Sequence, residues 1–279
     1  MTIENPEIAA NKANWDDRVP SHLAAYGVER FIADRDRLSD VVRDDLVLLA
    51  PHLPRRSPAE ARLLHLQCHI GLDTLSWARL GASVTGIDFS PASITAAQDI
   101  ATRAGLRADF ICAEINDAPS SCAGQFDIVY TGTGALCWLP NLTRWAQVIA
   151  ELLAPGGTFY VRDAHPVLNS LDLDRSDGEL VITRPYFPGE PLRYDDGTTY
   201  ADSEVRLSNR TTYEWQHSLS EIIQSLLDAG LTLTSFAEHE VLPWQALPEM
   251  IPSQRGWSLA EGQDRLPLTF SLTARKQGR

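Results

Sequence analysis

The 279-residue chain is poor in cysteine, poor in cationic side chains and without a long hydrophobic run. Its four cysteines form no CxxC pair and no zinc-like spacing, so we expect reduced thiols in a cytoplasmic protein. Three of them have apolar neighbours and are predicted to pack as small hydrophobes, namely Cys68, Cys112 and Cys137. No apolar segment reaches the roughly 18 residues that span a membrane, and the first residues lack the basic-then-apolar pattern of a signal peptide.

The charge balance is strongly acidic. Lys and Arg number 24 against 37 Asp and Glu, which gives a formal net charge of −13 at pH 7. Such a protein has no general electrostatic attraction to nucleic acid or to anionic membranes, and no basic patch interrupts the pattern. We therefore expect a small-molecule partner, no nucleic acid and no membrane, and a chain that acts as a monomer or a homodimer.

Strand and helix patterns alternate along the middle of the chain. Short apolar runs predict strands, and the stretches between them have helical spacing, with Ser90-Pro91 as a typical helix start. Five strands are predicted here and two closing strands later, at 63–68, 83–88, 109–112, 126–130, 158–161, 231–236 and 268–274. This alternation is typical of an α/β fold in which helices cover both faces of a Rossmann-like, seven-stranded, mostly parallel sheet.

The other segments flank or interrupt this unit, and we expect a single domain over residues 1–279. Residues 1–60 are polar with helical periodicity, and 61–165 hold the alternating strands. Residues 166–216 break the alternation, which predicts an insertion, and 217–279 carry the last helix, opened by a Ser-x-x-Glu capping box, and the closing strands. The aromatic residues of the insertion are Tyr186, Phe187, Tyr194, Tyr200, Tyr213 and Trp215.

Small and acidic residues follow the predicted strands. Gly71 lies in the turn after the first strand, Asp88 ends the second strand 17 residues later, and Glu114 follows the third. Because parallel strands present their carboxyl ends at one edge of a sheet, these residues should share a crevice. One carboxylate there can accept hydrogen bonds from the ribose hydroxyls of an adenosine, and another from its exocyclic amine. A Pro155-Gly156-Gly157 turn precedes the fifth strand.

In this order and spacing, the motifs of roughly residues 10–163 resemble those of class I S-adenosylmethionine-dependent methyltransferases. The segment 64–75 is also similar to a bacterial subgroup of small-molecule methyltransferases, some of them in secondary metabolism. In the family the first turn usually reads acidic-x-Gly-x-Gly-x-Gly, whereas the chain has His65, Gln67, His69 and Gly71 at these positions. The resemblance implies methyl transfer from S-adenosyl-L-methionine to oxygen, nitrogen or carbon of a small molecule, without a metal.

The resemblance also implies a set of cofactor-binding residues. They are Trp15, Arg18, Gln67, Cys68, His69, Gly71, Asp88, Phe89, Ser90, Glu114, Ile115 and Thr131. Within this set Asp88 would hold the ribose, and Glu114 with Ile115 the adenine. Residues 1–60 would form the family's helical lid, in which Arg18 would pair with the methionine carboxylate. His65, inside the first strand, is predicted to be a core histidine with its hydrogen bonds satisfied.

The acceptor side has fewer signals. His165 follows the fifth strand and His217 precedes the last helix, and both are candidate catalytic residues, His165 as a base. A structural hydrogen-bonding role is the alternative for each. The aromatic residues of 166–216 either wall an acceptor pocket as a cap or form a core of their own. Two other functions stay open here. One is a nicotinamide-dependent oxidoreductase, although the chain lacks the GxGxxG motif typical of that class. The other is a non-catalytic binder of S-adenosylmethionine.

Overall fold

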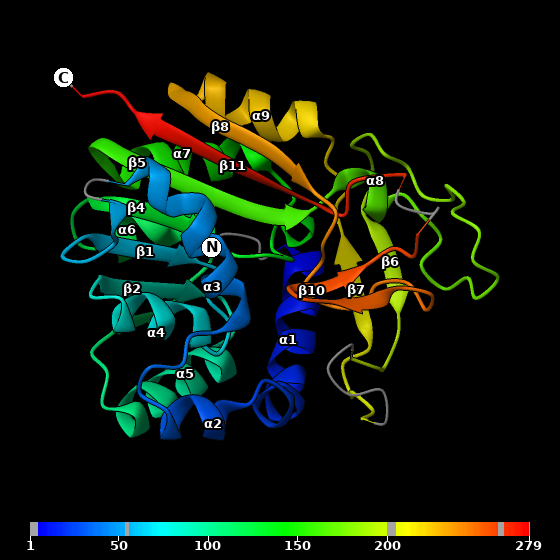
Figure 1. Cartoon of the computed structure of the whole chain (residues 1–279), viewed down its shortest axis with the longest axis horizontal. Coiled ribbons are helices and arrows are strands. Elements are labelled where there is room, and N and C mark those ends of the chain that lie inside the picture. Colours follow the sequence, from blue (N-terminus) through cyan, green and yellow to red (C-terminus); the bar gives the residue numbers. More distant parts are fainter. Residues whose placement is uncertain (1–4, 54–55, 200–204, 262–264, 279) are drawn as a thin grey trace.

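The structure is a computed structural model that describes residues 5–53, 56–199, 205–261 and 265–278. Its main sheet has seven strands in the order β3-β2-β1-β4-β5-β11-β8. Six of them run in the same direction, and β11 runs in the opposite direction between β5 and β8. The strands are β1 (Arg62–Leu66), β2 (Ser83–Asp88), β3 (Asp109–Cys112), β4 (Phe126–Thr131), β5 (Leu153–Ala164), β8 (Leu231–His239) and β11 (Thr269–Lys276). The predicted α/β fold with a seven-stranded, mostly parallel sheet is confirmed (Figure 1).

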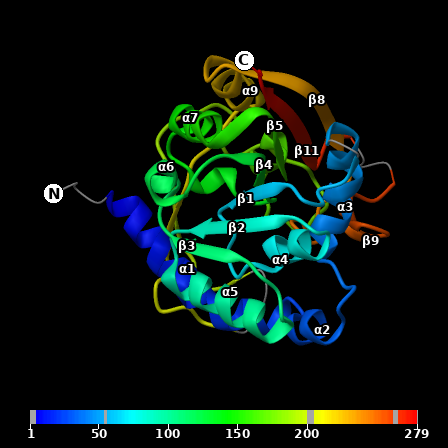
Figure 2. The same cartoon turned by 90° about the vertical axis from the view of Figure 1, so that its left-hand side faces the viewer.

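Helices cover both faces of this sheet. α6, α7 and α9 pack on one face, and α3, α4 and α5 on the other (Figure 2). The helices are α1 (Pro6–Ala25), α2 (Val28–Ala33), α3 (Asp40–Leu49), α4 (Leu72–Arg79), α5 (Pro91–Ala104), α6 (Ala118–Ser121), α7 (Leu142–Leu152), α8 (Pro166–Asn169) and α9 (Leu219–Asp228). Three short 3₁₀ turns are η1 (Ala50–His52), η3 (Ile115–Asp117) and η4 (Leu136–Trp138).

Two apolar cores lie on the two faces of the sheet. Leu64 and Val129 belong to the core under α7 and α9, whereas their neighbours Leu63 and Ile128 belong to the core under α3 and α4. Side chains alternate between the faces of a strand, so a strand that is apolar throughout supports helices on both sides. The uninterrupted apolar runs that predicted these strands therefore also predicted their burial.

Local signals fix several helix ends. The Ser90 hydroxyl accepts a hydrogen bond from the Ser93 N–H (3.0 Å), and α5 ends at Gly105, whose φ is 65°. The Ser218 hydroxyl accepts from the Glu221 N–H (3.2 Å) and begins α9. A side-chain oxygen at the first position satisfies an amide that has no partner inside the helix, and glycine adopts the left-handed end without strain. Both predicted helix starts are confirmed.

A buried polar cluster ties α3 to the sheet. The Asp45 carboxylate accepts hydrogen bonds from the hydroxyls of Tyr130 (2.5 Å) and Tyr160 (2.9 Å) and from the guanidinium of Arg162. All four side chains are buried, and the two tyrosine rings stack 5.8 Å apart. We call Asp45, Tyr130, Tyr160 and Arg162 the α3 cluster. Its hydrogen bonds hold α3 against β4 and β5.

The insertion after β5 contains a two-stranded sheet. Its strands β6 (Leu192–Asp195) and β7 (Thr211–Glu214) pair in antiparallel fashion. The Asn11 side chain of α1 donates to Tyr213 O and accepts from Tyr213 N, both at 2.8 Å, and so holds α1 along β7. In Figure 1, α1 stands between the main sheet and β6–β7, at the end toward which the parallel strands point. Tyr200 lies outside the described residues.

Three local predictions were wrong. β5 begins at Leu153 and continues through the predicted Pro-Gly-Gly turn, where Gly156 takes a φ of 80° beside a register shift between β4 and β5. Cys112 is exposed rather than packed, because β3 is an edge strand of the sheet. The segment between the two predicted closing strands, 231–236 and 268–274, for which the sequence predicted a loop and no further strand, contains a hairpin of β9 (Ile251–Ser253) and β10 (Gly256–Ser258).

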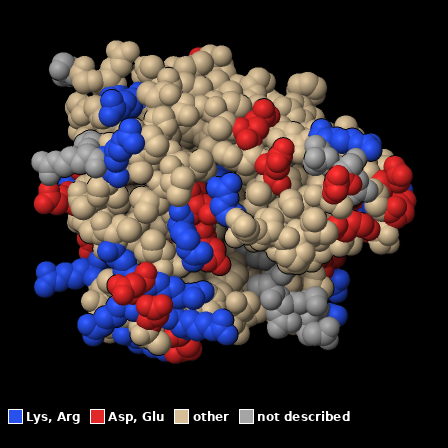
Figure 3. Space-filling model, viewed as in Figure 1, with Lys and Arg blue, Asp and Glu red and all other residues tan. Residues whose placement is uncertain are grey.

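The surface agrees with the acidic composition. Figure 3 shows carboxylates gathered at the right-hand edge of the molecule, where Figure 1 places the insertion. The acidic run of the insertion includes Asp174, Asp177 and Glu179, all of them exposed. Among the residues that the structure describes, no helix has the length and apolar character needed to cross a lipid bilayer.

Candidate active site

The turn after β1 keeps the backbone shape of a glycine-rich loop although it holds a single glycine. Gln67, His69 and Gly71 have positive φ values of 57°, 48° and 78°. A Cβ at Gly71 would lie 2.8 Å from the side chains of Ala97 and Phe110, so only glycine fits. Gln67 and His69 each adopt a conformation that costs of order 1 kcal/mol or more. Such strain is typical of ligand-binding turns. The three positive φ values fall at the positions where the family pattern has glycine, so the turn differs from that pattern in residue type but keeps backbone angles that glycine favours.

Asp88 ends β2 directly beside this turn. One carboxylate oxygen accepts from the His69 N–H (2.8 Å) and the other from the Ser90 N–H (2.9 Å). Burial raises the pKa of Asp88 to about 6, and these two hydrogen bonds oppose the rise. Each carboxylate oxygen has a second lone pair, so Asp88 organises the turn and can still accept from a ligand.

The end of β3 lies next to Asp88. The Ala113 N–H donates to Asp88 O (2.9 Å), and the Cys112 thiol lies 3.7 Å from Phe89 O. Glu114 follows, half-buried, and Ile115 begins η3 with a buried side chain. The structure therefore brings the four residues predicted to surround ribose and adenine to one edge of the sheet, and these are Asp88, Phe89, Glu114 and Ile115.

Three buried polar atoms at the ends of β1 and β4 have no partner in the described part of the chain. They are Gln67 Oε1, Thr131 Oγ1 and Thr133 Oγ1. The other end of the Gln67 amide donates to Ala135 O (2.9 Å), which fixes its orientation. Unpaired buried polar atoms are rare in folded proteins and are typical of sites that take a ligand or water. Gln67 and Thr131 were both predicted cofactor residues.

The predicted residues of α1 and the first turn lie against one another. The Trp15 ring is 5.1 Å from the His69 ring and 5.3 Å from that of Trp138. The Arg18 guanidinium lies over Trp15, 5.2 Å from its ring centre, and donates to Asn14 Oδ1 (2.6 Å). α1 therefore covers the turn after β1, and its role as a lid stays a prediction.

Two further predicted residues have mainly structural contacts. The Ser90 hydroxyl donates to the carboxylate of Asp16 in α1 (2.5 Å) in addition to capping α5. Cys68 is buried behind the turn, where Gly86 leaves room for its sulfur, and burial raises the pKa of its thiol well above the usual range. The contacts of both residues hold the turn in place, and their part in cofactor binding stays a prediction.

A histidine pair connects the lid to the turn, and the sequence analysis missed it. His22 Nδ1 lies 2.8 Å from His69 Nε2, and the outer nitrogens lie 2.9 Å from Thr199 Oγ1 and 3.0 Å from Ser93 Oγ. Burial, helped by the charge of Arg18, lowers the pKa of His22 to about 4, and burial also lowers the pKa of His69 well below its usual value. Both rings are therefore neutral at pH 7. A histidine in place of a turn glycine was the signal that could have found this pair.

Asp163, near the end of β5, organises the loop after β4. Its carboxylate accepts from the backbone N–H groups of Gly134 (2.5 Å), Ala135 (3.1 Å) and Leu136 (2.8 Å). Burial raises the pKa of Asp163, and these hydrogen bonds oppose the rise. The loop carries Trp138, so Asp163 positions one wall of the crevice. An acidic residue two positions after the predicted strand 158–161 was a partial signal for this role.

His165 has both ring nitrogens occupied. Nδ1 accepts from the Val167 N–H (3.1 Å) and caps α8, and Nε2 lies 2.9 Å from a carboxylate oxygen of Glu238 in β8. Burial lowers its pKa, and Glu238 opposes this. These contacts favour the structural alternative, and its role as a base stays a prediction.

His217 joins α9 to the loop after β4. Nε2 lies 2.8 Å from Leu139 O, and Nδ1 lies 3.0 Å from a carboxylate oxygen of Glu221. This pairing explains how His217 holds the start of α9. Its catalytic role likewise stays a prediction.

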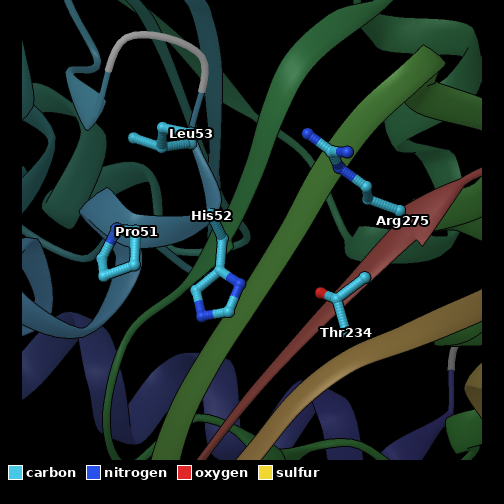
Figure 4. Close-up of a pocket in the computed structure, with 5 residues that line it drawn as sticks. All are labelled: Pro51, His52, Leu53, Thr234 and Arg275. Atoms are coloured by element: carbon cyan, nitrogen blue, oxygen red, sulfur yellow. The ribbon is translucent and has the colours of Figure 1, made fainter.

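A shallow hollow lies at the opposite end of the sheet (Figure 4). Its lining residues are Pro51, His52, Leu53, Thr234 and Arg275. Arg275 pairs with Thr158 near the start of β5, far from the crevice where the parallel strands end. The predicted site residues therefore do not line it. In the described ranges, no group of three or more His, Cys, Asp or Glu side chains is arranged to hold a metal ion.

Comparison with known proteins gives the family. Residues 63–157 match a family model described as a methyltransferase domain. The chain contains a class I S-adenosylmethionine-dependent methyltransferase domain. A ubiquinone biosynthesis O-methyltransferase of Xanthomonas axonopodis pv. citri (strain 306) is 36% identical over 107 residues, which cover 38% of this chain and 44% of that protein. The chain thus spans less than half the length of this curated relative.

The methyltransferase fold extends beyond the matched segment. A structure of an S-adenosylmethionine-dependent methyltransferase from Mesorhizobium loti aligns with a TM-score of 0.58 and 21% identity, covering 82% of this chain and 96% of that one. Magnesium protoporphyrin IX methyltransferase from Synechocystis PCC 6803, solved with bound S-adenosylhomocysteine (SAH), aligns at 0.52 and 14%, covering 94% and 100%. These likenesses concern the fold, which is that of proteins binding this cofactor. The finding that speaks against the nicotinamide-dependent alternative is the methyltransferase family match of residues 63–157.

Proposed function

We propose that the protein transfers a methyl group from S-adenosyl-L-methionine to a small molecule. One observation carries the proposal. Asp88, the strained turn after β1 and the unpaired polar atoms of Gln67 and Thr131 meet at the carboxyl edge of the sheet of a methyltransferase domain. An edge of this kind is where open α/β sheets bind their ligands.

The residues present fit the cofactor. The free lone pairs of Asp88 suit two ribose hydroxyls, and Gln67 Oε1 can accept from the amino group of the methionine part. Arg18, on the lid above the turn, suits the methionine carboxylate. When bound, the cofactor supplies an electrophilic methyl group on its sulfonium sulfur.

The task of the chain is to hold two ligands in line and keep water out. α1 covers the turn through Trp15, and Asp163 holds the loop that places Trp138 against Trp15. A fixed geometry of this kind removes much of the entropic part of the barrier to transfer. We therefore assign Trp15, Trp138 and Asp163 to positioning and to the exclusion of water.

The acceptor enters, in our proposal, between α1, η4 and β6–β7. Segments 1–60 and 166–216 then act as lid and cap on a single domain. The aligned relative is by name an O-methyltransferase, which supports oxygen ahead of nitrogen or carbon as the acceptor atom. The net charge of −13 supports a small molecule rather than a nucleic acid or a membrane. No residue that the structure describes is needed as a metal ligand for this scheme.

Calorimetry and a transfer assay test the proposal together. We expect SAH and S-adenosylmethionine to bind the folded protein in a 1:1 complex, and radiolabelled methyl to pass to at least one member of a panel of phenols, amines and carboxylic acids. No heat of binding at about 1 mM of either nucleoside would contradict the proposal. Binding without transfer to any panel member would favour the non-catalytic alternative.

A further inference from the structure

Three polar side chains of the insertion lie at the β6–β7 sheet. Tyr194 of β6 and Glu214 of β7 share one face of this pair, because Glu214 lies opposite Leu192, two residues before Tyr194. The Arg184 guanidinium lies over the ring of Tyr194, 5.7 Å from its centre. Burial raises the pKa of Tyr194 to about 12, with the charge of Glu214 adding to it. Burial also raises the pKa of Glu214, and the charges of Arg184 and Arg18 oppose this. Arg184, Tyr194 and Glu214 thus act on one another electrostatically, and we call them the cap cluster.

The cap cluster is not paired internally. Within the described ranges of the chain, neither the Glu214 carboxylate nor the Tyr194 hydroxyl makes a hydrogen bond. The Arg184 guanidinium has one ion-pair contact, at 4.0 Å, with the exposed carboxylate of Asp174, while its own side chain is only 20% exposed. The three side chains are only partly buried, and their polar atoms keep some access to water. A ligand that takes the place of this water can therefore supply the hydrogen-bond partners that the described residues do not.

The cluster borders the proposed cofactor residues. The Trp215 N–H donates to Cys137 O (2.8 Å) and so joins the end of β7 to η4. Glu214, one residue before Trp215, acts on the half-buried Cys137. Burial of its sulfur raises the pKa of the Cys137 thiol, and the charge of Glu214 adds to this rise. The next residue, Trp138, contacts Trp15 at 5.3 Å. A molecule held by the cap cluster would therefore lie beside the lid and the turn after β1.

We propose that the cap cluster is the acceptor subsite and that the acceptor is a small aromatic carboxylic acid with a hydroxyl or amino group. Its carboxylate pairs with Arg184, and its hydroxyl or amino group donates to Glu214. This inference rests on the proposed methyl transfer, because it names the acceptor of that reaction.

The chemistry of each side chain selects this class. A guanidinium presents paired N–H donors that match the two oxygens of a carboxylate, and an ionised glutamate only accepts. The ring of Tyr194 beside Arg184 and the indole of Trp138 offer flat surfaces to an aromatic ring. In a chain of net charge −13, an arginine turned inward provides positive charge that the surface in general lacks.

Binding of a matched probe panel tests the subsite without turnover. The probes are 4-hydroxybenzoate, benzoate and methyl 4-hydroxybenzoate, titrated calorimetrically into the protein with and without SAH. We expect 4-hydroxybenzoate to bind at least about tenfold more tightly than its methyl ester, which lacks the anion. SAH is titrated separately, so a failure of the proposed function and a failure of the subsite give different results.

Variants then locate the contacts. Arg184→Met should weaken binding of 4-hydroxybenzoate at least about tenfold, with Arg184→Lys in between. Glu214→Gln should weaken 4-hydroxybenzoate and leave benzoate, which has no hydroxyl, unchanged. Arg193→Met is the matched control, because Arg193 lies next to Tyr194 on β6, is exposed, and makes one weak contact, at 3.4 Å, with Thr211. All variants should bind SAH as the parent does.

Several results would overturn the subsite. They are equal binding of acid and ester, equal effects of Arg184→Met and Arg193→Met, and no binding of 4-hydroxybenzoate at about 5 mM to protein that binds SAH. The acid–ester comparison uses the parent protein, so it decides the question even if Arg184→Met does not fold.

Discussion

Two clusters of this molecule are built from the same kinds of side chain, an arginine, a carboxylate and tyrosine. In the α3 cluster, the fully buried Asp45 accepts from two tyrosine hydroxyls and from Arg162. In the cap cluster, Glu214 and Arg184 form no direct pair within the described residues, and both retain some contact with solvent.

This difference in pairing distinguishes charged groups that stabilise the fold from charged groups that can bind a ligand. A buried charge that has all its partners can hold strands and helices together, and its removal leaves the partners uncompensated. A charge that is partly withdrawn from water and has no protein partner weakens folding rather than strengthening it, but it can pair with a ligand. Residue type alone does not distinguish these cases, whereas the pairing of each polar atom does.

The largest expected effect is on the α3 cluster. Asp45→Ala leaves Arg162 buried without its carboxylate, so we expect the free energy of unfolding to fall by about 3–5 kcal/mol. Glu214→Ala is the matched substitution in the cap cluster and should change it by less than about 1 kcal/mol. Urea unfolding at pH 7 measures both. Equal losses in the two variants would remove the distinction between the clusters.

Asp88 lies between the two cases, because it is paired with backbone amides and still has free lone pairs. Asp88→Asn should weaken SAH binding by about 1.5–3 kcal/mol, or roughly 10- to 150-fold, since a neutral amide replaces a charged acceptor. Calorimetry measures this, with exposed Asp99→Asn as the control. Because Asp88 also holds the β1 turn, the melting temperature of the variant is needed beside the affinity. Unchanged affinity in a folded variant would remove Asp88 from the ribose.

The pH dependence of SAH binding sharpens the same point. The pKa of Asp88 is raised to about 6, so the carboxylate is ionised at pH 7 and gains a proton as the pH falls through 6. Affinity should then fall by up to about tenfold per pH unit below 6. The effect of Asp88 on stability has the opposite sign: its raised pKa favours folding below about 4, and this contribution is lost as the pH rises through 6. An SAH affinity that is constant from pH 7.5 to 5 would contradict the assignment.

The smallest effect is expected at His165, whose ring is paired at both nitrogens like the α3 cluster. His165→Ala removes the cap of α8 and the contact with Glu238, so we expect a loss of about 1–2 kcal/mol in unfolding free energy. With SAH affinity unchanged, kcat should fall less than about threefold. A fall in kcat of about a hundredfold or more would instead establish the catalytic role predicted from sequence.

Much of the fold could be predicted because its signals are local. The apolar runs gave the strands, Ser90-Pro91 and Ser218 gave helix starts, and the parallel-strand rule brought Asp88 next to the turn at Gly71. Errors arose where the exposure of a residue depends on the arrangement of the whole sheet. Cys112 is exposed because β3 lies at the edge, which no local pattern of the strand reveals.

The contacts that complete the site join residues far apart in the sequence. His22 and His69 are 47 positions apart, and Asp163 reaches back to the amides of 134–136. The strands of the insertion bring Tyr194 and Glu214 to the loop after β4, although neither residue belongs to a recognisable motif. Such pairings depend on how lid, loop and insertion pack on one another. The sequence therefore predicted where the crevice lies, but not which side chains form hydrogen bonds with one another within it.

The most direct test of the account is a crystal structure of the protein with SAH. The account predicts the ribose hydroxyls within hydrogen-bond distance of the Asp88 carboxylate, with the adenine beside Phe89 and Ile115 and the amino-acid end near Gln67. SAH bound elsewhere, for example in the hollow at His52 and Arg275, with Asp88 contacting only its two backbone amides, would contradict it.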